Sequence, residues 1–207
     1  MVEQPRKRIP AEERRSAILT AAIPVFAANG YERATTREIA RAAGVAEGTL
    51  YRHFAGKREL LTAVMQSLVL LPISNILATG VTTDDDTIMQ ALLRDRFDEI
   101  SKHRDLLKVI LAQAFFDSEL ASHLGVQVIT PVMTIVSEYF HRRIADGVFV
   151  AMPPEVPMRA IMGIVFSQLM FSLMIPQSEQ TVAEREVLIQ QLSSMILDGV
   201  RKKEVTA

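Results

Sequence analysis

The chain has 207 residues, of which 49% are hydrophobic, and its formal net charge at pH 7 is −1. This length suits one compact body with a small additional domain, and the hydrophobic content is ample for a buried core. The sequence contains no cysteine, which excludes disulfides, thiol redox chemistry and thiolate metal sites.

The small net charge hides an uneven distribution along the chain. Residues 1–58 contain eleven Lys or Arg and six Asp or Glu, a net charge of +5, whereas the remainder carries −6. A basic end on an acidic body favours contact with DNA through that end only. The first residues include Arg6, Lys7 and Arg8 but lack the apolar stretch of a signal peptide, so we expect a cytoplasmic protein.

The first expected helix begins near residue 11 and contains Pro24. A proline inside a helix typically costs about 3 kcal/mol and removes one backbone hydrogen bond. We therefore expect the helix to kink or divide there and to free the carbonyl near Thr20.

Residues 36–54 predict two short helices separated by a tight turn. Ile39 and Ala40 lie on one face at helical spacing. Gly44 stands where the first helix should end, because glycine adopts positive φ without steric cost. Leu50 and Phe54 give the second helix its own apolar stripe. This pattern is typical of a helix-turn-helix, which presents its second helix to the major groove of DNA.

The second helix can be laid out at about 100° per residue. With Leu50 inward, Gly48 and Arg52 point outward, and Thr49 and Tyr51 lie on the flanks. An exposed helical glycine costs about 1 kcal/mol against alanine, which is understandable if DNA must approach the backbone closely. A plain helical hairpin with a solvated outer face is the alternative, and the joint pattern favours DNA binding.

Three neighbouring positions complete this region. Ala46 is a poor N-cap for the second helix. Glu47 can stabilise the N-terminus of that helix, and its position on the flank favours a structural role. Lys57 lies just past Gly56 at the start of the next helix, where its cation and free backbone N–H groups can meet one phosphate.

Residues 11 to about 65 resemble the DNA-binding domain of the TetR/AcrR family of bacterial transcription regulators, most specifically in the run from Gly48 to Phe54 followed by Lys57. The resemblance implies an all-α homodimer. Residues 1–56 would form an N-terminal three-helix helix-turn-helix head, and residues 57–207 a C-terminal helical-bundle body for effector binding and dimerisation. By match of position, the family's DNA contacts fall on Thr36, Arg37, Gly48, Thr49, Tyr51, Arg52, His53 and Lys57, with Arg37 the weakest of these.

The rest of the chain predicts helices only. Pro72 is expected to end or bend the first of them, Asp86 or Thr87 to cap the second, and Pro131 to bend or divide the fourth. Thr181 and Glu184 form a capping box at the start of the last helix. The expected helices cover residues 57–76, 87–102, 105–116, 118–146, 157–175 and 182 onward.

Residues 158–175 are apolar enough that a membrane-spanning helix has to be considered. Eighteen residues are at the lower edge for a spanning helix, and a helix that is apolar all round is equally expected in the centre of a soluble bundle. We favour the bundle and expect no membrane association.

The last two helices carry the prediction of a homodimer. One stripe runs through the final helix, and small residues four apart lie on the preceding one, so two copies can form a four-helix interface. Burial of both helices inside one monomer is the alternative. The expected interface residues are Gly163, Ser167, Ile189, Leu192 and Ile196.

An effector site is the least defined part of the sequence. Met and Phe side chains suit a lipophilic small molecule, and one amide can act as a polar handle, although each residue taken alone fits plain core better. The candidate lining residues are Phe97, Gln113, Phe116, Met133, Val136, Phe140, Phe166 and Met170.

Catalytic patterns are weak. None of the four histidines has a metal-ligand partner at helical spacing, and no phosphate loop or nucleophile elbow is present, so we expect no enzyme, metal or cofactor. The sequence predicts a regulator, by preference a repressor, that binds a pseudo-palindromic double-stranded DNA operator as a dimer and is released by a small lipophilic effector. An all-helical enzyme and a protein-binding adaptor are the alternatives.

Overall fold

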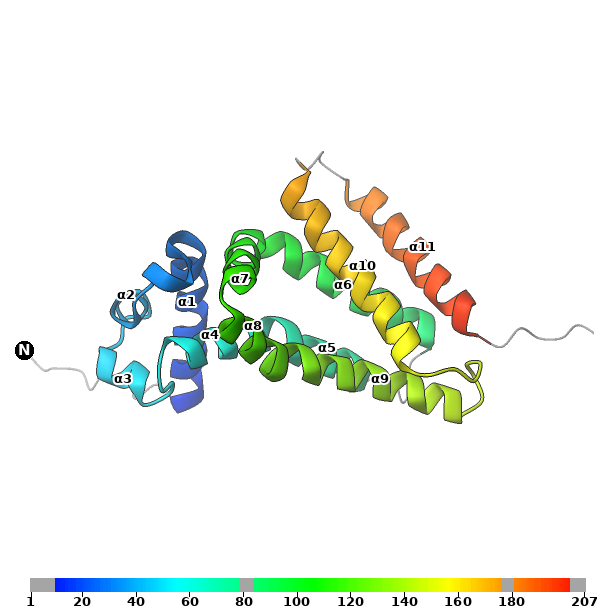
Figure 1. Cartoon of the computed structure of the whole chain (residues 1–207), viewed down its shortest axis with the longest axis horizontal. Helices are drawn as coiled ribbons and strands as arrows, with labels where there is room; N and C mark the ends of the chain where they lie inside the picture. The colour runs from blue at the N-terminus through cyan, green and yellow to red at the C-terminus, as the bar shows by residue number, and fades with distance from the viewer. Residues whose placement is uncertain (1–9, 79–83, 176–180, 202–207) are drawn as a thin grey trace, which may run out of the picture.

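The computed structural model describes residues 10–78, 84–175 and 181–201, and within these ranges the only non-helical pairing is one isolated bridge. The predicted all-α fold is confirmed. The basic residues 6–8 and residues 79–83, between the first two expected body helices, lie outside the described residues. The N-terminal head and its connection to the body consist of α1 (Ala11–Arg33), α2 (Thr36–Ala42), α3 (Glu47–Tyr51) and α4 (Lys57–Met65) (Figure 1).

The body continues from α4 as a bundle, with α10 and α11 side by side along one edge (Figure 1). Two π-helical turns, η1 and η3, interrupt its long helices. Its elements are η1 (Gln66–Leu70), α5 (Leu71–Ala78), α6 (Asp85–Lys102), α7 (Arg104–Phe116), α8 (Ser118–Leu124), η3 (Gly125–Ile129), α9 (Thr130–Ala145), α10 (Glu155–Met174) and α11 (Val182–Val200).

Buried apolar side chains form two clusters. The first joins the head to α4, α7 and α8, and it includes Phe26, Leu50, Leu60 and Leu106. The second fills the far part of the body around Phe140. The helix α4 therefore packs with the head, and the boundary predicted after residue 56 does not separate two cores.

Pro24 does not divide α1. The helix runs from Ala11 to Arg33, and its only residue with non-helical torsion angles is Gly30, at φ 75° and ψ 170°. A glycine tolerates this positive φ without steric cost, so the break in α1 falls near the end of the helix.

Pro72 follows the π-helical turn η1, and the helix begun at Lys57 continues past it to Ala78. Proline has no N–H to give to the carbonyl four residues earlier, which here belongs to Leu68. The buried Arg96 of α6 supplies the donor instead, with Nη1 2.9 Å from the Leu68 oxygen. Pro72 thus shifts the hydrogen-bond pattern without ending the helix.

Pro131 repeats this arrangement after η3. The carbonyl four residues earlier belongs to Gln127, and it accepts a hydrogen bond from Nε2 of Gln66 at 3.0 Å. The helix from Ser118 to Ala145 is therefore continuous, with a π-helical joint where we expected a bend or a division. Each proline joint is completed by a side chain from another helix.

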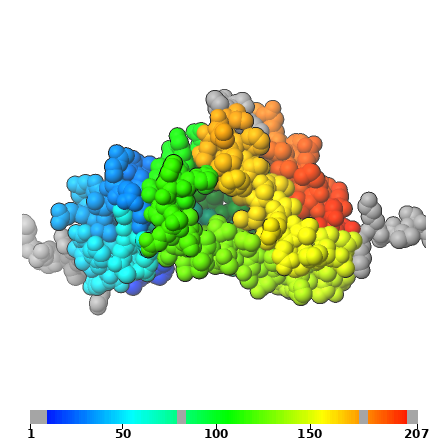
Figure 2. All heavy atoms as spheres, viewed as in Figure 1, coloured from blue at the N-terminus to red at the C-terminus, as the bar shows by residue number. Residues whose placement is uncertain are grey.

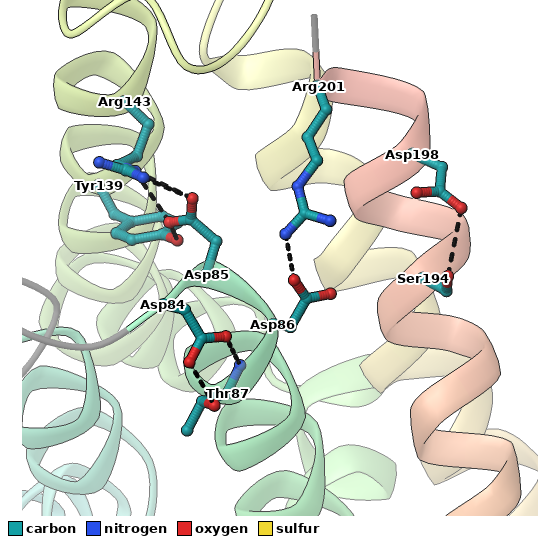
Figure 3. A network of polar contacts seen from close by, with 9 residues as sticks. All are labelled: Asp84, Asp85, Asp86, Thr87, Tyr139, Arg143, Ser194, Asp198 and Arg201. Carbon is teal, nitrogen blue, oxygen red and sulfur yellow. Dashed lines mark hydrogen bonds and ion pairs between the residues drawn. The ribbon is translucent and has the colours of Figure 1, made fainter. Parts of the chain in front are cut away.

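A largely buried ionic cluster joins the start of α6 to the last turns of α9 (Figure 3). Asp85, at the start of α6, is 5% exposed and accepts hydrogen bonds from the Tyr139 hydroxyl and from Nε of Arg143, the latter at 2.8 Å. Burial, followed by the hydrogen bond to Asp85, raises the pKa of Tyr139 far above its usual value. The cluster fixes α6 to α9.

Two further acidic residues flank Asp85 (Figure 3). Asp84 caps α6 by accepting a hydrogen bond from the Thr87 N–H at 2.9 Å, so the predicted cap at Asp86 or Thr87 was wrong by a few residues. Asp86 instead pairs with Arg201, just past α11. Three consecutive aspartates therefore serve a helix cap, a buried ion pair and a tie to α11.

Three described helices are long and apolar enough to cross a membrane: Lys57–Ala78, Ser118–Ala145 and Glu155–Met174. Within the described bundle the first contributes the largest buried share and the last the smallest, 44% against 22% of the most apolar window. The helix α10 therefore leaves much of its apolar surface uncovered by its own chain.

Candidate nucleic-acid interface

The helix α2 begins with a capping box. The Thr35 hydroxyl accepts the Glu38 N–H at 3.2 Å, and a Glu38 carboxylate oxygen accepts the Thr35 N–H at 3.0 Å. The Thr35 hydroxyl also donates to this carboxylate at 2.9 Å, and this bond, followed by the one from the Thr35 N–H, holds the pKa of Glu38 below its usual value. The cap fixes where α2 starts and thus places Thr36 at the exposed end of the helix.

The turn between α2 and α3 has the geometry expected from Gly44. Its φ is 66°, its N–H donates to the Arg41 carbonyl at 3.1 Å, and the Val45 N–H donates to the Ala40 carbonyl at 3.0 Å. This pair of bonds is a Schellman motif, which ends a helix at a left-handed residue. The turn sets the direction in which α3 leaves α2.

The helix α3 has one buried and one exposed face. Leu50 and Phe54 are buried, at 0% and 1% exposure, whereas Gly48, Tyr51 and Arg52 are exposed. A Cβ atom built on Gly48 would meet nothing within 4 Å. The predicted orientation is confirmed, and the surface above Gly48 is open to a close approach by another molecule.

The predicted contact residues of α2 and α3 are joined by hydrogen bonds. The Thr36 hydroxyl lies 2.9 Å from Oε1 of Glu47 and 3.1 Å from the Tyr51 hydroxyl. Nε of Arg37 lies 3.6 Å from Oε2 of Glu47. We expected Glu47 to have only a structural role, yet it contacts two of the predicted DNA-contact residues. The only signal in the sequence was a pair of polar residues at the starts of two crossing helices.

The remaining predicted contacts lie at the end of α3 and beyond it. Nη2 of Arg52 donates to the Thr49 hydroxyl at 3.2 Å, and the half-buried His53 packs against Phe54. Lys57 is turned toward α1, with Nζ 2.9 Å from the Glu32 carbonyl oxygen and 4.5 Å from the centre of the Tyr31 ring. Lys57 thus ties α4 to α1 in the free protein, a contact the sequence did not suggest.

This arrangement defines a class of protein, a helix-turn-helix DNA-binding protein with an exposed recognition helix held by a helical body. Residues 18–64 match the family model described as bacterial regulatory proteins, tetR family. Over these residues the chain is similar to the TetR family of transcriptional regulators.

Known relatives and solved structures agree with this assignment. The HTH-type transcriptional activator FasR of Mycolicibacterium smegmatis is 42% identical over 94 residues, a segment that spans 45% of this chain and 43% of FasR. This chain thus matches less than half the length of that curated relative. FasR is named a transcriptional activator, and the matching family model describes regulatory proteins rather than enzymes.

Two solved structures share the fold over nearly the whole chain. A putative TetR-family regulator from Mesorhizobium loti has a TM-score of 0.74 at 18% identity and covers 94% of this chain and 100% of its own. The regulator FadR from Bacillus subtilis, solved in complex with stearoyl-CoA, has a TM-score of 0.71 at 18% identity and covers 90% and 99%. At these identities the likeness shows the fold alone.

The structure does not bring the predicted effector-lining residues together in one cavity. Phe97, Val136 and Phe140 are buried in the second cluster, as the core alternative anticipated. Phe116 is 91% exposed at the end of α7 and Phe166 is 50% exposed on α10, so both were wrong as cavity-lining residues within the single chain.

The other three candidates have different positions. Gln113 faces the head, with Nε2 3.5 Å from a Glu32 carboxylate oxygen, and Met170 is half-buried on α10. Met133 lines an open groove of about 680 Å³ between α9 and the start of α10. Separately, Figure 2 shows a hollow in the body between α7–α8 (green) and α10 (yellow to orange).

The predicted interface residues divide between two faces. Ile189 and Ile196 are 1% and 7% exposed, because they pack into the second cluster of their own chain, and Leu192 is partly buried against it. Ile189 and Ile196 are thus already buried within one chain, as the alternative of burial inside one monomer anticipated. Gly163 and Ser167 are exposed on α10.

Proposed function

We propose that the chain is a dimeric, ligand-responsive transcriptional repressor that binds a pseudo-palindromic operator and is released by a small lipophilic effector. The observation that carries DNA recognition is the exposed face of α3, where the open surface over Gly48 adjoins Tyr51 and Arg52. A helix with this face fits the major groove, where side chains reach base edges and phosphates.

The proposed contact residues are those named from the sequence. Thr36 and Tyr51 lie together at the junction of α2 and α3, and Arg37 lies beside them. Lys57 has to leave the Glu32 carbonyl, or share its protons with it, in order to bind a phosphate. An ammonium group has three donors, so sharing is chemically possible.

Dimerisation is supported by an apolar stripe on the outer face of α10 and α11. Phe166, Phe171 and Met174 are 50%, 59% and 79% exposed, and on α11 Val187 and Met195 are 51% and 62% exposed. Large apolar side chains left exposed on two neighbouring helices favour an interaction site there. A second copy of the same two helices would cover it as a four-helix interface with two-fold symmetry, which requires a two-fold related operator.

The effector class rests on the relatives and on the shape of the body. FadR was solved with stearoyl-CoA, and another curated relative, 41% identical over 49 residues, is named the fatty acid metabolism regulator protein of Bacillus subtilis. The hollow in Figure 2 is bordered by α10, one of the most apolar described helices. We therefore propose a long-chain acyl compound as the effector, acting by tighter binding to a state whose heads no longer fit the operator.

Activation is the second candidate, because FasR is named a transcriptional activator. Repression and activation use the same DNA-binding face and differ in where the operator lies relative to the promoter. Either role places the protein with the chromosome, in the cytoplasm.

An electrophoretic mobility shift assay on the DNA flanking the gene of this protein tests the proposal. We expect saturable binding that unrelated DNA does not compete away, and release by stearoyl-CoA but not by coenzyme A alone. Binding that is equal for flanking and unrelated DNA would contradict sequence-specific regulation. Specific binding that stearoyl-CoA leaves unchanged would contradict only the effector class.

A further inference from the structure

Glu47 is the first residue of α3, and its carboxylate reaches across to the start of α2. Its side chain is 35% exposed, at the edge of the face that carries the proposed DNA contacts. One oxygen, Oε1, lies 2.9 Å from the Thr36 hydroxyl, and the other, Oε2, lies 3.6 Å from Nε of Arg37. A negative charge at this place repels phosphates, so its presence needs a reason beyond phosphate binding.

The chemistry of these groups fixes the direction of the hydrogen bonds. An ionised carboxylate only accepts, so the Thr36 hydroxyl must donate its single proton to Glu47. The contact of 3.1 Å between the hydroxyls of Thr36 and Tyr51 must then use the Tyr51 proton. The order of donation is Tyr51 to Thr36 to Glu47.

This order determines what the edge of α3 offers to a partner. Tyr51 is half exposed, and with its proton directed at Thr36 its hydroxyl presents lone pairs outward. Oε2 of Glu47 adds a second acceptor beside it. Phosphates offer only acceptors, so the groups that match this edge in the major groove are the exocyclic amino groups of cytosine N4 and adenine N6.

We propose that Glu47 is a specificity-determining residue of the DNA-binding face. It positions Thr36 and Tyr51 and keeps this edge of α3 an acceptor, so that one position in each half-site is restricted to a base pair that offers an amino group there. The inference rests on the proposed function, because it requires α3 to enter the major groove. It assigns a role to a residue outside the contacts implied by the family resemblance.

The test is selection from a random double-stranded DNA library by the full-length protein and by Glu47→Ala and Glu47→Gln. For the unchanged protein we expect one position per half-site with a preference of about tenfold for cytosine or adenine, the size of a single good base contact. In Glu47→Ala this preference should fall to about twofold or less, because Tyr51 is free to donate. Non-specific affinity should rise, because a charge facing the phosphates is lost.

The conservative variant separates positioning from simple charge loss. Glu47→Gln keeps an oxygen that accepts from Thr36 and replaces the other acceptor by an amide donor. We expect it to retain a preference at the same position but to shift it toward adenine, which an amide can bind through both N6 and N7. A purely structural role would leave the base preference of all three proteins the same.

A double-mutant cycle tests the route through Thr36. Thr36→Val removes the hydroxyl that links Tyr51 to Glu47 while keeping the shape of the side chain. If the link carries the effect, Glu47→Ala should change base preference much less in the Thr36→Val background than in the unchanged protein. Equal changes in the two backgrounds would overturn the relay through Thr36.

The control is Glu12→Ala, which removes the same charge from the first turn of α1, outside the hydrogen-bonded group. Its base preference should equal that of the unchanged protein, and thermal unfolding should show every variant folded. Identical preferences for the unchanged protein, Glu47→Ala and Glu47→Gln would overturn the role of Glu47 while leaving the proposed function intact. If the unchanged protein selects no sequence at all, the proposed function fails, and this inference fails with it.

Discussion

The head and the far part of the body differ in where their hydrogen-bonded polar groups lie. In the head, Thr36, Glu47 and Tyr51 are bonded to one another at the surface, where a partner can compete for them. In the body, Asp85 and Arg143 are bonded to one another where solvent hardly reaches, while apolar side chains lie outside on α10 and α11.

This difference indicates where each region awaits a partner. A surface of satisfied but accessible polar groups can exchange its bonds for those of DNA at small cost, because water already competes for them. An exposed apolar stripe gains by being covered permanently. The head is thus suited to reversible contact, and the α10–α11 face to a lasting one.

The largest expected effect comes from charging that lasting contact. Met195→Glu should give a folded monomer, because each dimer would bury two unpaired charges at about several kcal/mol apiece. Met195 is a better probe than Leu192, because Leu192 also packs within its own chain. A change at Leu192 would therefore affect folding as well as assembly. Sedimentation velocity measures the outcome.

The matched control for Met195→Glu is Ser122→Glu, which adds the same charge at an exposed position on α8, outside α10 and α11. It should remain a dimer. If Met195→Glu also remains a tight dimer, the lasting contact lies on another face, and the argument for a two-fold operator loses its support.

The next effect concerns the buried ionic cluster. Asp85→Asn should lower the free energy of unfolding by about 1–3 kcal/mol, because Tyr139 and Arg143 lose a buried charged acceptor while Arg143 keeps its longer pair with Asp146. Denaturant unfolding followed by circular dichroism gives this number. Asp86→Asn is the control, because the side chains of the Asp86–Arg201 pair are 45% and 35% exposed, and a pair that solvent reaches should be worth only about 0–1 kcal/mol. Equal losses in the two variants would mean that burial does not distinguish these pairs.

Blocking the reversible contact should cost affinity and leave stability alone. Gly48→Leu places a bulky side chain on the open face of α3, and we expect operator affinity to fall at least about a hundredfold. The fold should be unchanged or firmer by up to about 1 kcal/mol, because leucine is the better helix former. In a shift assay, the operator affinity of Gly48→Ala should lie between that of the unchanged protein and that of Gly48→Leu. Normal affinity for Gly48→Leu would mean that α3 does not enter the groove.

The smallest effect is expected at Lys57. Lys57→Ala should weaken binding to all DNA sequences alike and make the log–log salt slope shallower by about 0.9 per half-site, because a phosphate contact carries no base information. It should also cost about 0.5–1 kcal/mol of stability through the lost contact with Tyr31. A lower stability with an unchanged salt slope would assign Lys57 to the tie with α1 alone.

The same comparison explains how much the sequence could reveal. The helix-turn-helix was predictable because Gly44, Gly48 and Leu50 specify it within a few residues. The hydrogen bonds of Glu47 were not, because Thr36 and Glu47 are eleven positions apart and meet only through the crossing of α2 and α3.

In the body, helical spacing gave the helices but not their orientation. The stripe with Ile189 and Ile196 was correctly identified as a buried face, yet spacing alone does not say whether its own chain or a second copy buries it. Phe116 shows the same limit, since an apolar residue at the end of a helix can face the core or the solvent. These decisions depend on contacts between residues far apart in the sequence.

We expect the two proline joints to cause correlated substitutions at positions that are far apart in the sequence. Pro72 leaves a carbonyl that Arg96 serves, and Pro131 leaves one that Gln66 serves. A descendant that exchanged Pro72 for another residue would regain a backbone N–H that competes with Arg96 for this carbonyl, and would leave the guanidinium with its pair to Asp95 alone. One that lost Arg96 first would strand the carbonyl. Among diverging relatives, Pro72 and Arg96 should therefore be gained and lost as a pair, and Pro131 and Gln66 as another.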